Sequence, residues 1–213
     1  MRSIILIVDD HPLVGEAFEL SIKAGYAHFD VGRVTSAAEA QAYARKYGER
    51  IKLVLLDLML PDVTGFTAVL RLQQQLPGCP IAIVSARTDG HTVAMARTFG
   101  VAGYLSKSMP FSDLAAAIGP LTRGEKIFPV DAPAPSPVAA DFHRKLSNLS
   151  AAQLRVLTAL ADGRLNKQIA NDMSLTEGTV KQHLSAIFRK LGVNNRSQAI
   201  LAVQPYLGSP DEG

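Results

Sequence analysis

The stretch LVLLDLMLPDVTGF, residues 53–66, places one carboxylate, Asp57, at the end of an apolar run. A buried carboxylate without a partner costs free energy, so a chain seldom places one there without a use. Residues 53–56 have the pattern of a parallel strand buried on both faces, and Pro61 and Gly65 indicate a loop after it. Ligands bind at the carboxyl ends of strands in open α/β sheets, which makes Asp57 a candidate site residue. On this stretch alone, an aspartate that merely caps the following turn is an equally good interpretation.

Strand-like and helix-like patterns alternate through residues 1–126. The predicted strands are residues 3–9, 29–34, 51–57, 81–85 and 102–105. Amphipathic stretches lie between them, and Ser36 and Glu39 have the spacing of a capping box that begins a helix. Five such alternations predict an α/β domain, a (βα)5 doubly wound parallel sheet with helices on both faces.

A proline-rich segment, residues 127–147, is the predicted linker. Pro129, Pro133, Pro135 and Pro137 predict that residues 128–145 lack regular structure and form a semi-stiff extended tether. Residues 148–213 contain no strand pattern and are predicted to be an all-α domain of four helices with a short C-terminal tail. These helices are expected from Ser150, over residues 166–172, from near Thr176 and from near Asn195.

Composition and charge restrict the classes of protein that fit. No apolar run approaches the ~20 residues of a membrane helix, and the first residues show no signal-peptide cleavage pattern. The single cysteine, Cys79, has no intramolecular disulfide partner, which fits a reducing compartment. We therefore expect a cytoplasmic protein without a membrane partner. Residues 149–200 carry an excess of Lys and Arg over Asp and Glu, which indicates a polyanionic partner for the second domain.

Polar residues end four of the predicted strands. Asp9 and Asp10 end the first strand, which can neighbour the third strand and Asp57. Three clustered carboxylates repel one another unless a hard cation such as Mg²⁺ lies among them. Ser85 and Lys107 add a hydroxyl and an ammonium, and the set would stabilise a phosphoryl group transferred to Asp57 as nucleophile. Taken singly, Ser85 is equally a strand-end cap and Lys107 a solvated surface residue.

Four motifs carry a resemblance to a known family. VDDHP (8–12), LLDLMLPDVTG (55–65), VSAR (84–87) and GYLSK (103–107) resemble the receiver domain of two-component response regulators. The resemblance implies a histidine kinase or small phosphodonor as partner and Mg²⁺ as cofactor. The implied residues are Asp57 as phosphoryl acceptor, Asp9, Asp10 and the backbone carbonyl of Met59 as further metal ligands, Ser85 and Tyr104 as a switch pair, and Lys107 as the family's lysine.

The predicted helix over residues 176–191 is amphipathic. At 100° per residue one side collects Val180, Leu184, Ile187, Phe188 and Leu191. The opposite side collects Gln182, Ser185, Ala186 and Arg189, with Thr179, Lys181 and Lys190 at its margins. A short, polar and basic face suits the major groove of DNA. The solvated face of a small helical bundle explains the helix alone equally well.

Residues 160–200, LADGRLNKQIANDMSLTEGTVKQHLSAIFRKLGVNNRSQAI, resemble the LuxR-type helix-turn-helix of the NarL/FixJ response regulators. The resemblance implies a scaffold helix over 166–172 and a recognition helix over 176–191, with Lys181, Gln182 and Ser185 close to the bases. The residues expected at phosphates, some of them on helical geometry, are Lys167, Thr179, Arg189, Lys190 and Arg196. One departure is Gln153, which stands where the family commonly has a glutamate that forms a salt bridge.

Together these patterns predict a phosphorylation-controlled transcription regulator and not a free-standing enzyme. Phosphorylation of Asp57 would control dimerisation and sequence-specific binding to double-stranded DNA, with half-sites about 10 bp apart. RNA polymerase is a further partner that the resemblance implies. Two alternatives remain: a DNA-binding regulator that does not use its receiver as a switch, and a phosphate sink or interaction protein whose DNA binding is vestigial.

Overall fold

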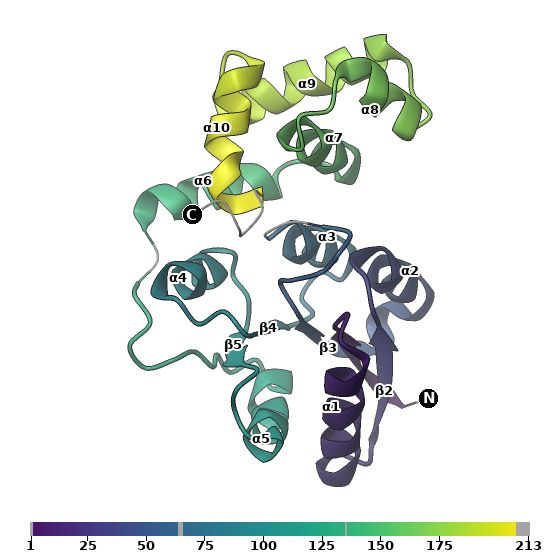
Figure 1. The fold of residues 1–213 in the computed structure, drawn as a ribbon, viewed down its shortest axis with the longest axis vertical. Coiled ribbons are helices and arrows are strands. Elements are labelled where there is room, and N and C mark those ends of the chain that lie inside the picture. Colours follow the sequence, from purple (N-terminus) through teal and green to yellow (C-terminus); the bar gives the residue numbers. More distant parts are fainter. Residues whose placement is uncertain (1, 64–65, 135, 208–213) are drawn as a thin grey trace. The chain divides into compact units, whose positions relative to one another are not determined.

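The computed structural model describes residues 2–63, 66–134 and 136–207 (Figure 1). The chain divides into two compact units, Met1–Ser136 and Pro137–Gly213. Each unit is built around its own buried apolar residues.

The first unit contains a parallel sheet of five strands in the order β2-β1-β3-β4-β5. The strands are β1 (Ser3–Val8), β2 (Phe29–Val34), β3 (Ile51–Leu56), β4 (Ile81–Ser85) and β5 (Gly103–Ser106). In the register of β1 and β3, Val8 lies opposite Leu56. The residues that follow these two strands, Asp9 and Asp57, therefore leave the same edge of the sheet, as the sequence predicts.

Helices cover both faces of this sheet (Figure 1). Their bounds are α1 (Pro12–Gly25), α2 (Ala37–Tyr47), α3 (Thr67–Gln75), α4 (Gly90–Thr98) and α5 (Phe111–Thr122), with a single 3-10 turn, η1 (Gly48–Arg50), after α2. Helices α1 and α5 pack on one face, where Phe18 and Ile118 meet Ile5 and Leu53. Helices α2, α3 and α4 lie on the other face. The predicted doubly wound α/β fold is confirmed.

Local capping explains where α2 begins. The Ser36 hydroxyl accepts a hydrogen bond from the Glu39 amide at 3.2 Å. The Glu39 carboxylate accepts from the Thr35 amide at 2.8 Å, one residue before the partner that a capping box uses. Asp62, in the loop after β3, adds a bidentate cap that the sequence did not reveal, because its carboxylate accepts from the amides of Ala37 and Ala38.

In the described part of the second unit, residues 137–207, all regular elements are helices. They are α6 (Pro137–Ser147), α7 (Ala151–Ala161), α8 (Asn166–Asp172), α9 (Glu177–Leu191) and α10 (Arg196–Leu207). The reciprocal capping box of Ser150 and Gln153 begins α7, as predicted. Helix α7 packs against α8, α9 and α10, and α8 also packs against α9; Leu154, Ile169 and Val203 are completely buried.

The prediction that residues 128–145 lack regular structure is wrong in its second half, where α6 forms. Pro137 is the first residue of α6, a position at which its missing N–H costs no helical hydrogen bond. Leu146 is fully buried, and the Phe142 ring stacks on Tyr206 of α10 with 4.8 Å between ring centroids. Tertiary packing therefore makes a helix from a segment that its prolines marked as extended.

Within the described part of the chain, no helix is both long and apolar enough to cross a membrane.

Candidate functional site

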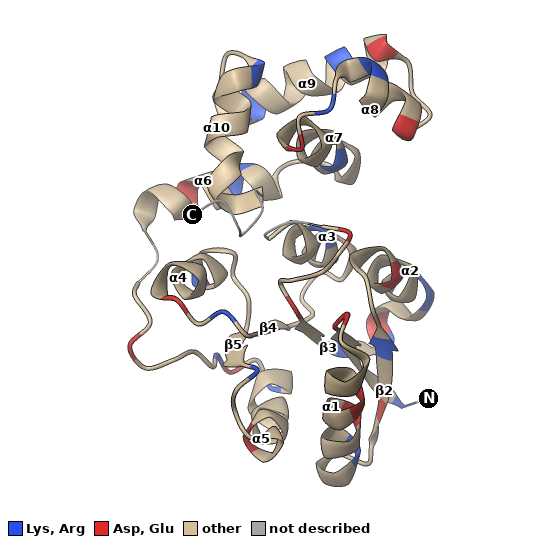
Figure 2. Cartoon of the chain, viewed as in Figure 1, with Lys and Arg blue, Asp and Glu red and all other residues tan. Residues whose placement is uncertain are grey.

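Two carboxylates and one lysine meet at the carboxyl edge of the sheet. Asp57 after β3 is 2% exposed and Asp9 after β1 is 6% exposed. Lys107, after β5, places its ammonium 2.6 Å from Asp57 Oδ2 and 2.7 Å from Asp9 Oδ2. In Figure 2 acidic segments mark the ends of β1 and β3. One cation thus bridges two buried anions, which offsets part of their repulsion and of their desolvation.

The charge of Lys107 is stabilised by its neighbours. Burial alone would lower the pKa of Lys107, but hydrogen bonds and charge attraction from Asp57 and Asp9 outweigh burial and raise the pKa. The lysine therefore stays protonated and places a positive charge between the two carboxylates.

The residues of this edge fit a divalent cation. Oxygen atoms of Asp9, Asp10 and Asp57 and a ring nitrogen of His11 all lie within 4.8 Å of one another. His11 Nδ1 lies 2.9 Å from Asp10 Oδ1, yet that oxygen accepts no hydrogen bond from the described residues. A carboxylate oxygen that accepts no hydrogen bond can serve as a metal ligand, and carboxylate oxygens are the ligands that Mg²⁺ prefers.

Met59 follows closely in the loop after β3. Its amide donates to Asp57 Oδ1 at 3.1 Å, whereas Lys107 donates to the other oxygen, Oδ2. Both oxygens of Asp57 therefore have donors, and the side chain of Met59 stands exposed beside them.

Ser85 and Tyr104 lie on β4 and β5 at the same edge. Ser85 is fully buried, and its hydroxyl accepts from the Arg87 amide at 3.2 Å. Tyr104 points inward, and its hydroxyl donates to the Arg87 carbonyl. Burial raises the pKa of Tyr104 to about 12. The peptide units around Arg87 are thus bound by both hydroxyls that the sequence singled out.

In the second unit, α9 presents the face that the sequence predicts. Val180, Leu184, Ile187 and Leu191 are buried, while Phe188 is half-buried. Thr176 caps the amino end of α9, and Gly192 ends it in a left-handed conformation with φ of 77°. The candidate base-contacting residues, Lys181, Gln182 and Ser185, are exposed on α9. Basic segments lie on α7 to α10 (Figure 2).

The five candidate phosphate-contacting residues divide into two groups. Lys167 on α8 and Arg189 on α9 are exposed, and Thr179 is half-buried with its hydroxyl 2.9 Å from that of Thr176. By contrast, Lys190 and Arg196 make hydrogen bonds within the unit. Lys190 donates to the Asn148 carbonyl at 2.9 Å and to Gln153 Oε1 at 2.8 Å, and Arg196 donates to the Arg164 carbonyl at 2.8 Å.

Comparisons with known proteins assign a different family model to each of the two units. Residues 5–119 match the response regulator receiver domain, and residues 147–203 match the bacterial regulatory proteins of the luxR family. The chain is 36% identical to the Glycerol metabolism activator of Pseudomonas putida over 207 residues, with 93% of each chain covered. It is 28% identical to the response regulator protein VraR of Staphylococcus aureus, covering 92% of this chain and 94% of VraR.

This chain belongs to the two-component response regulators. Solved structures agree in fold: an RcsB response regulator of Salmonella typhimurium matches with a TM-score of 0.55 at 20% identity, covering 96% of this chain and 99% of RcsB. A LuxR-family response regulator from Aurantimonas sp. matches at 26% identity with a TM-score of 0.55, covering 62% of this chain and 93% of that one. The response regulator therefore combines a receiver domain with a LuxR-type DNA-binding domain.

Two features of the response regulator escaped the sequence argument. His11 lies at the acidic cluster, although its place in VDDHP was the only available signal. Lys190 on α9 donates to Gln153 Oε1 on α7 at 2.8 Å. The helical periodicity placed Lys190 at the margin of the polar face of this helix, but it could not identify a partner on α7.

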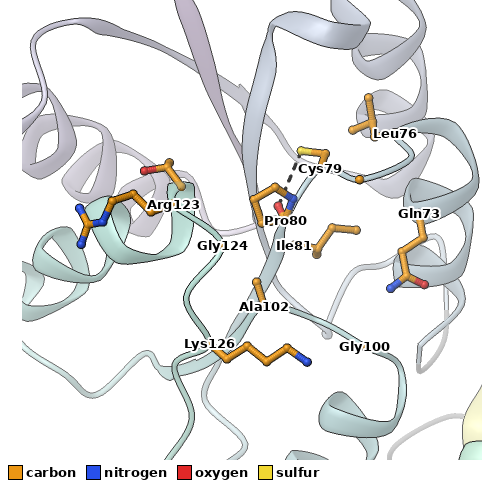
Figure 3. Close-up of a pocket in the computed structure, with 12 residues that line it drawn as sticks. Gln73, Leu76, Cys79, Pro80, Ile81, Gly100, Ala102, Arg123, Gly124 and Lys126 are labelled. Atoms are coloured by element: carbon orange, nitrogen blue, oxygen red, sulfur yellow. Dashed lines mark hydrogen bonds between the residues drawn. The ribbon is translucent and has the colours of Figure 1, made fainter.

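A cavity of about 470 Å³ lies away from the carboxylates and includes Gln73, Cys79 and Lys126 in its lining (Figure 3). The Cys79 thiol donates to the carbonyls of Ile51 and Pro80. Burial raises the pKa of Cys79 to about 11, so its thiol is a poor nucleophile.

Proposed function

We propose that Asp57 is the phosphoryl acceptor of this response regulator and that its phosphorylation controls dimerisation and DNA binding. The observation that carries the proposal is the Lys107 ammonium between Asp57 and Asp9, at 2.6 and 2.7 Å from their carboxylates. A histidine kinase is the proposed phosphodonor, because the chain contains the receiver domain of two-component systems.

In the proposed transfer, a carboxylate oxygen of Asp57 attacks phosphorus in line with the bond to the donor nitrogen. The P–N bond breaks and its electron pair stays on the nitrogen, so that a phosphohistidine protonated at its other ring nitrogen leaves as neutral imidazole, and Asp57 becomes an acyl phosphate. Lys107 and the Ser85 hydroxyl then supply a charge and a hydrogen bond to phosphoryl oxygens.

The cation proposed for the site is Mg²⁺, held by Asp9, Asp10, Asp57 and the backbone carbonyl of Met59. It would neutralise charge on the phosphoryl oxygens during transfer. The proposed role of Asp9 and Asp10 is to hold and orient this cation. The Asp10 oxygen that accepts no hydrogen bond supports this assignment.

The proposed output is binding of double-stranded DNA by a homodimer, with α9 in the major groove. Lys181, Gln182 and Ser185 would face base edges, and Lys167, Thr179 and Arg189 would face phosphates. Lys190 and Arg196 keep their intramolecular partners, so their predicted phosphate role has less support. RNA polymerase is the further partner proposed for transcription control, and the proposed location is the cytoplasm.

The test is to treat the full chain with acetyl phosphate and Mg²⁺ and to locate the phosphoryl group by tandem mass spectrometry. The expected result is a label on Asp57, absent from Asp57→Ala, together with a shift from monomer to dimer in analytical ultracentrifugation. Glu49→Gln is the matched control, because it removes one exposed carboxylate of the same unit. A label elsewhere, or a dimer that forms equally in Asp57→Ala, contradicts the proposal.

A further inference from the structure

The chain does not leave the sheet when α5 ends. Ile127, five residues after α5, forms a parallel bridge with Gly103 at the outer edge of β5. The Ile127 amide donates to the Ala102 carbonyl at 3.0 Å, and the Tyr104 amide donates to the Ile127 carbonyl at 2.8 Å. The start of the linker thus covers the edge strand β5, and it binds the backbone of Tyr104, whose side chain points inward.

Gly103 makes this approach possible. A Cβ at residue 103 would stand 2.9 Å from the Ile127 carbonyl oxygen, closer than side chains tolerate. Figure 3 shows the two segments side by side, at Ala102, which precedes Gly103, and at Lys126, which precedes Ile127.

The same segment then follows α4. The guanidinium carbon of Arg97 lies 4.6 Å from the centroid of the Phe128 ring, within range of a cation–π interaction. Residues 129–132 form a turn closed by the Ala132 amide and the Pro129 carbonyl. Pro133 Cδ lies 3.5 Å from the position of a Cβ on Gly90, the first residue of α4. Residues 127–133 therefore contact β5 and both ends of α4, and we name them the clasp.

A chain of contacts leads from the carboxylate edge through Arg87 and Asp89 to Gly90, where Pro133 of the clasp packs. Ser85 and Tyr104 both bind the peptide units around Arg87 through their hydroxyls, and Asp89 follows as the cap of α4, accepting from the Thr92 amide at 2.8 Å. A phosphoryl group on Asp57 that draws the Ser85 hydroxyl would act on this loop first and then on the amino end of α4, against which Pro133 packs.

We propose that the clasp is a docked strap whose release from β5 and α4 is favoured by phosphorylation of Asp57. This rests on the proposed function of Asp57. The tether to the DNA-binding unit would then lengthen by the released residues when the receiver is phosphorylated. Phosphorylation and docking would be coupled equilibria, so weakening the clasp must favour the phosphorylated form by the same factor.

The test uses the full chain with Mg²⁺ and beryllofluoride, a phosphoryl mimic, in place of a turning-over phosphodonor. Amide hydrogen exchange is followed at Tyr104 and Ile127, and beryllofluoride affinity is followed by fluorine NMR. The variant Phe128→Ala removes the ring that faces Arg97. The control Val130→Ala lies in the same segment with its side chain 98% exposed.

The expected result is faster exchange of both amides when beryllofluoride binds. Phe128→Ala should tighten beryllofluoride binding by roughly 2- to 5-fold, the size of one cation–π interaction, and Val130→Ala should leave it unchanged. If beryllofluoride binds but exchange at the clasp and the affinity of Phe128→Ala stay as in the native chain, the clasp proposal is overturned and Asp57 keeps its role. If beryllofluoride binds Asp57→Ala as well as the native chain, the proposed function fails and the clasp proposal with it.

Discussion

At the scale of single residues, Lys107 stabilises the receiver as well as serving the proposed chemistry. Replacing it by methionine leaves Asp9 and Asp57 buried without their shared cation. We expect Lys107→Met to lower the free energy of unfolding by about 2 kcal/mol without metal, and Mg²⁺ to restore more stability to the variant than to the native chain. Urea unfolding with and without a chelator measures both. Lys126→Met, at an exposed lysine, is the control, and equal losses in the two variants would contradict this role.

Tyr104 sets a pH dependence at the same scale. Its pKa rises from 10.0 to about 12, with burial as the largest cause. Since the folded chain holds this proton more tightly than the unfolded chain, the stabilisation is complete below pH 10 and is lost as pH rises toward 12. Absorbance of tyrosinate should show a late step that Tyr104→Phe removes. If Tyr104→Phe shows the same late step as the native chain, that step does not come from Tyr104 and the prediction is contradicted.

At the scale of elements, α9 and α7 meet through Lys190 and Gln153, with 2.8 Å between Nζ and Oε1. Glutamate at residue 153 would keep the cap of α7 and add a salt bridge at a helix amino end. We expect Gln153→Glu to raise the free energy of unfolding by about 1 kcal/mol. Gln168→Glu is the matched control, because Gln168 caps α8 in the same way, by accepting from the Leu165 amide. A gain of the same size in Gln168→Glu would exclude the contribution of Lys190.

The exposed face of α9 gives a second prediction for elements. Lys181→Ala should weaken DNA binding by about 1–3 kcal/mol and leave stability unchanged, because its side chain is exposed. Arg189→Ala should reduce the salt dependence of binding by about one counterion, as loss of a phosphate contact does. Lys190→Ala should instead lower stability, since its ammonium holds the Asn148 carbonyl. Binding titrations at several salt concentrations and urea unfolding separate these effects.

At the scale of the whole molecule, the parts that local pattern determines were predictable. The periodicity of apolar residues predicts the five strands and the buried stripe of α9. The capping residues Ser36 and Ser150 follow from partners three residues further along the chain. The gathering of Asp9, Asp57 and Lys107 followed from one rule about strand ends.

What failed depends on contacts far apart in the sequence. Helix α6 forms because Phe142 meets Tyr206, and the proline pattern gave no sign of that contact. The pairing of Ile127 with β5 and the cap that Asp62 provides to α2 are also long-range contacts. A single sequence fixes neither the partner nor the distance in such cases, so these parts of the response regulator required its structure.

The central claim is that phosphorylation of Asp57 strengthens DNA binding. The most direct measurement is the affinity of the full chain for double-stranded DNA selected from a random pool. It is made at one ionic strength, with and without acetyl phosphate and Mg²⁺, for the native chain and Asp57→Ala. We expect tighter binding by the treated native chain and no change for Asp57→Ala. Equal affinity of both chains in every condition would contradict it and would favour a regulator that does not use its receiver as a switch.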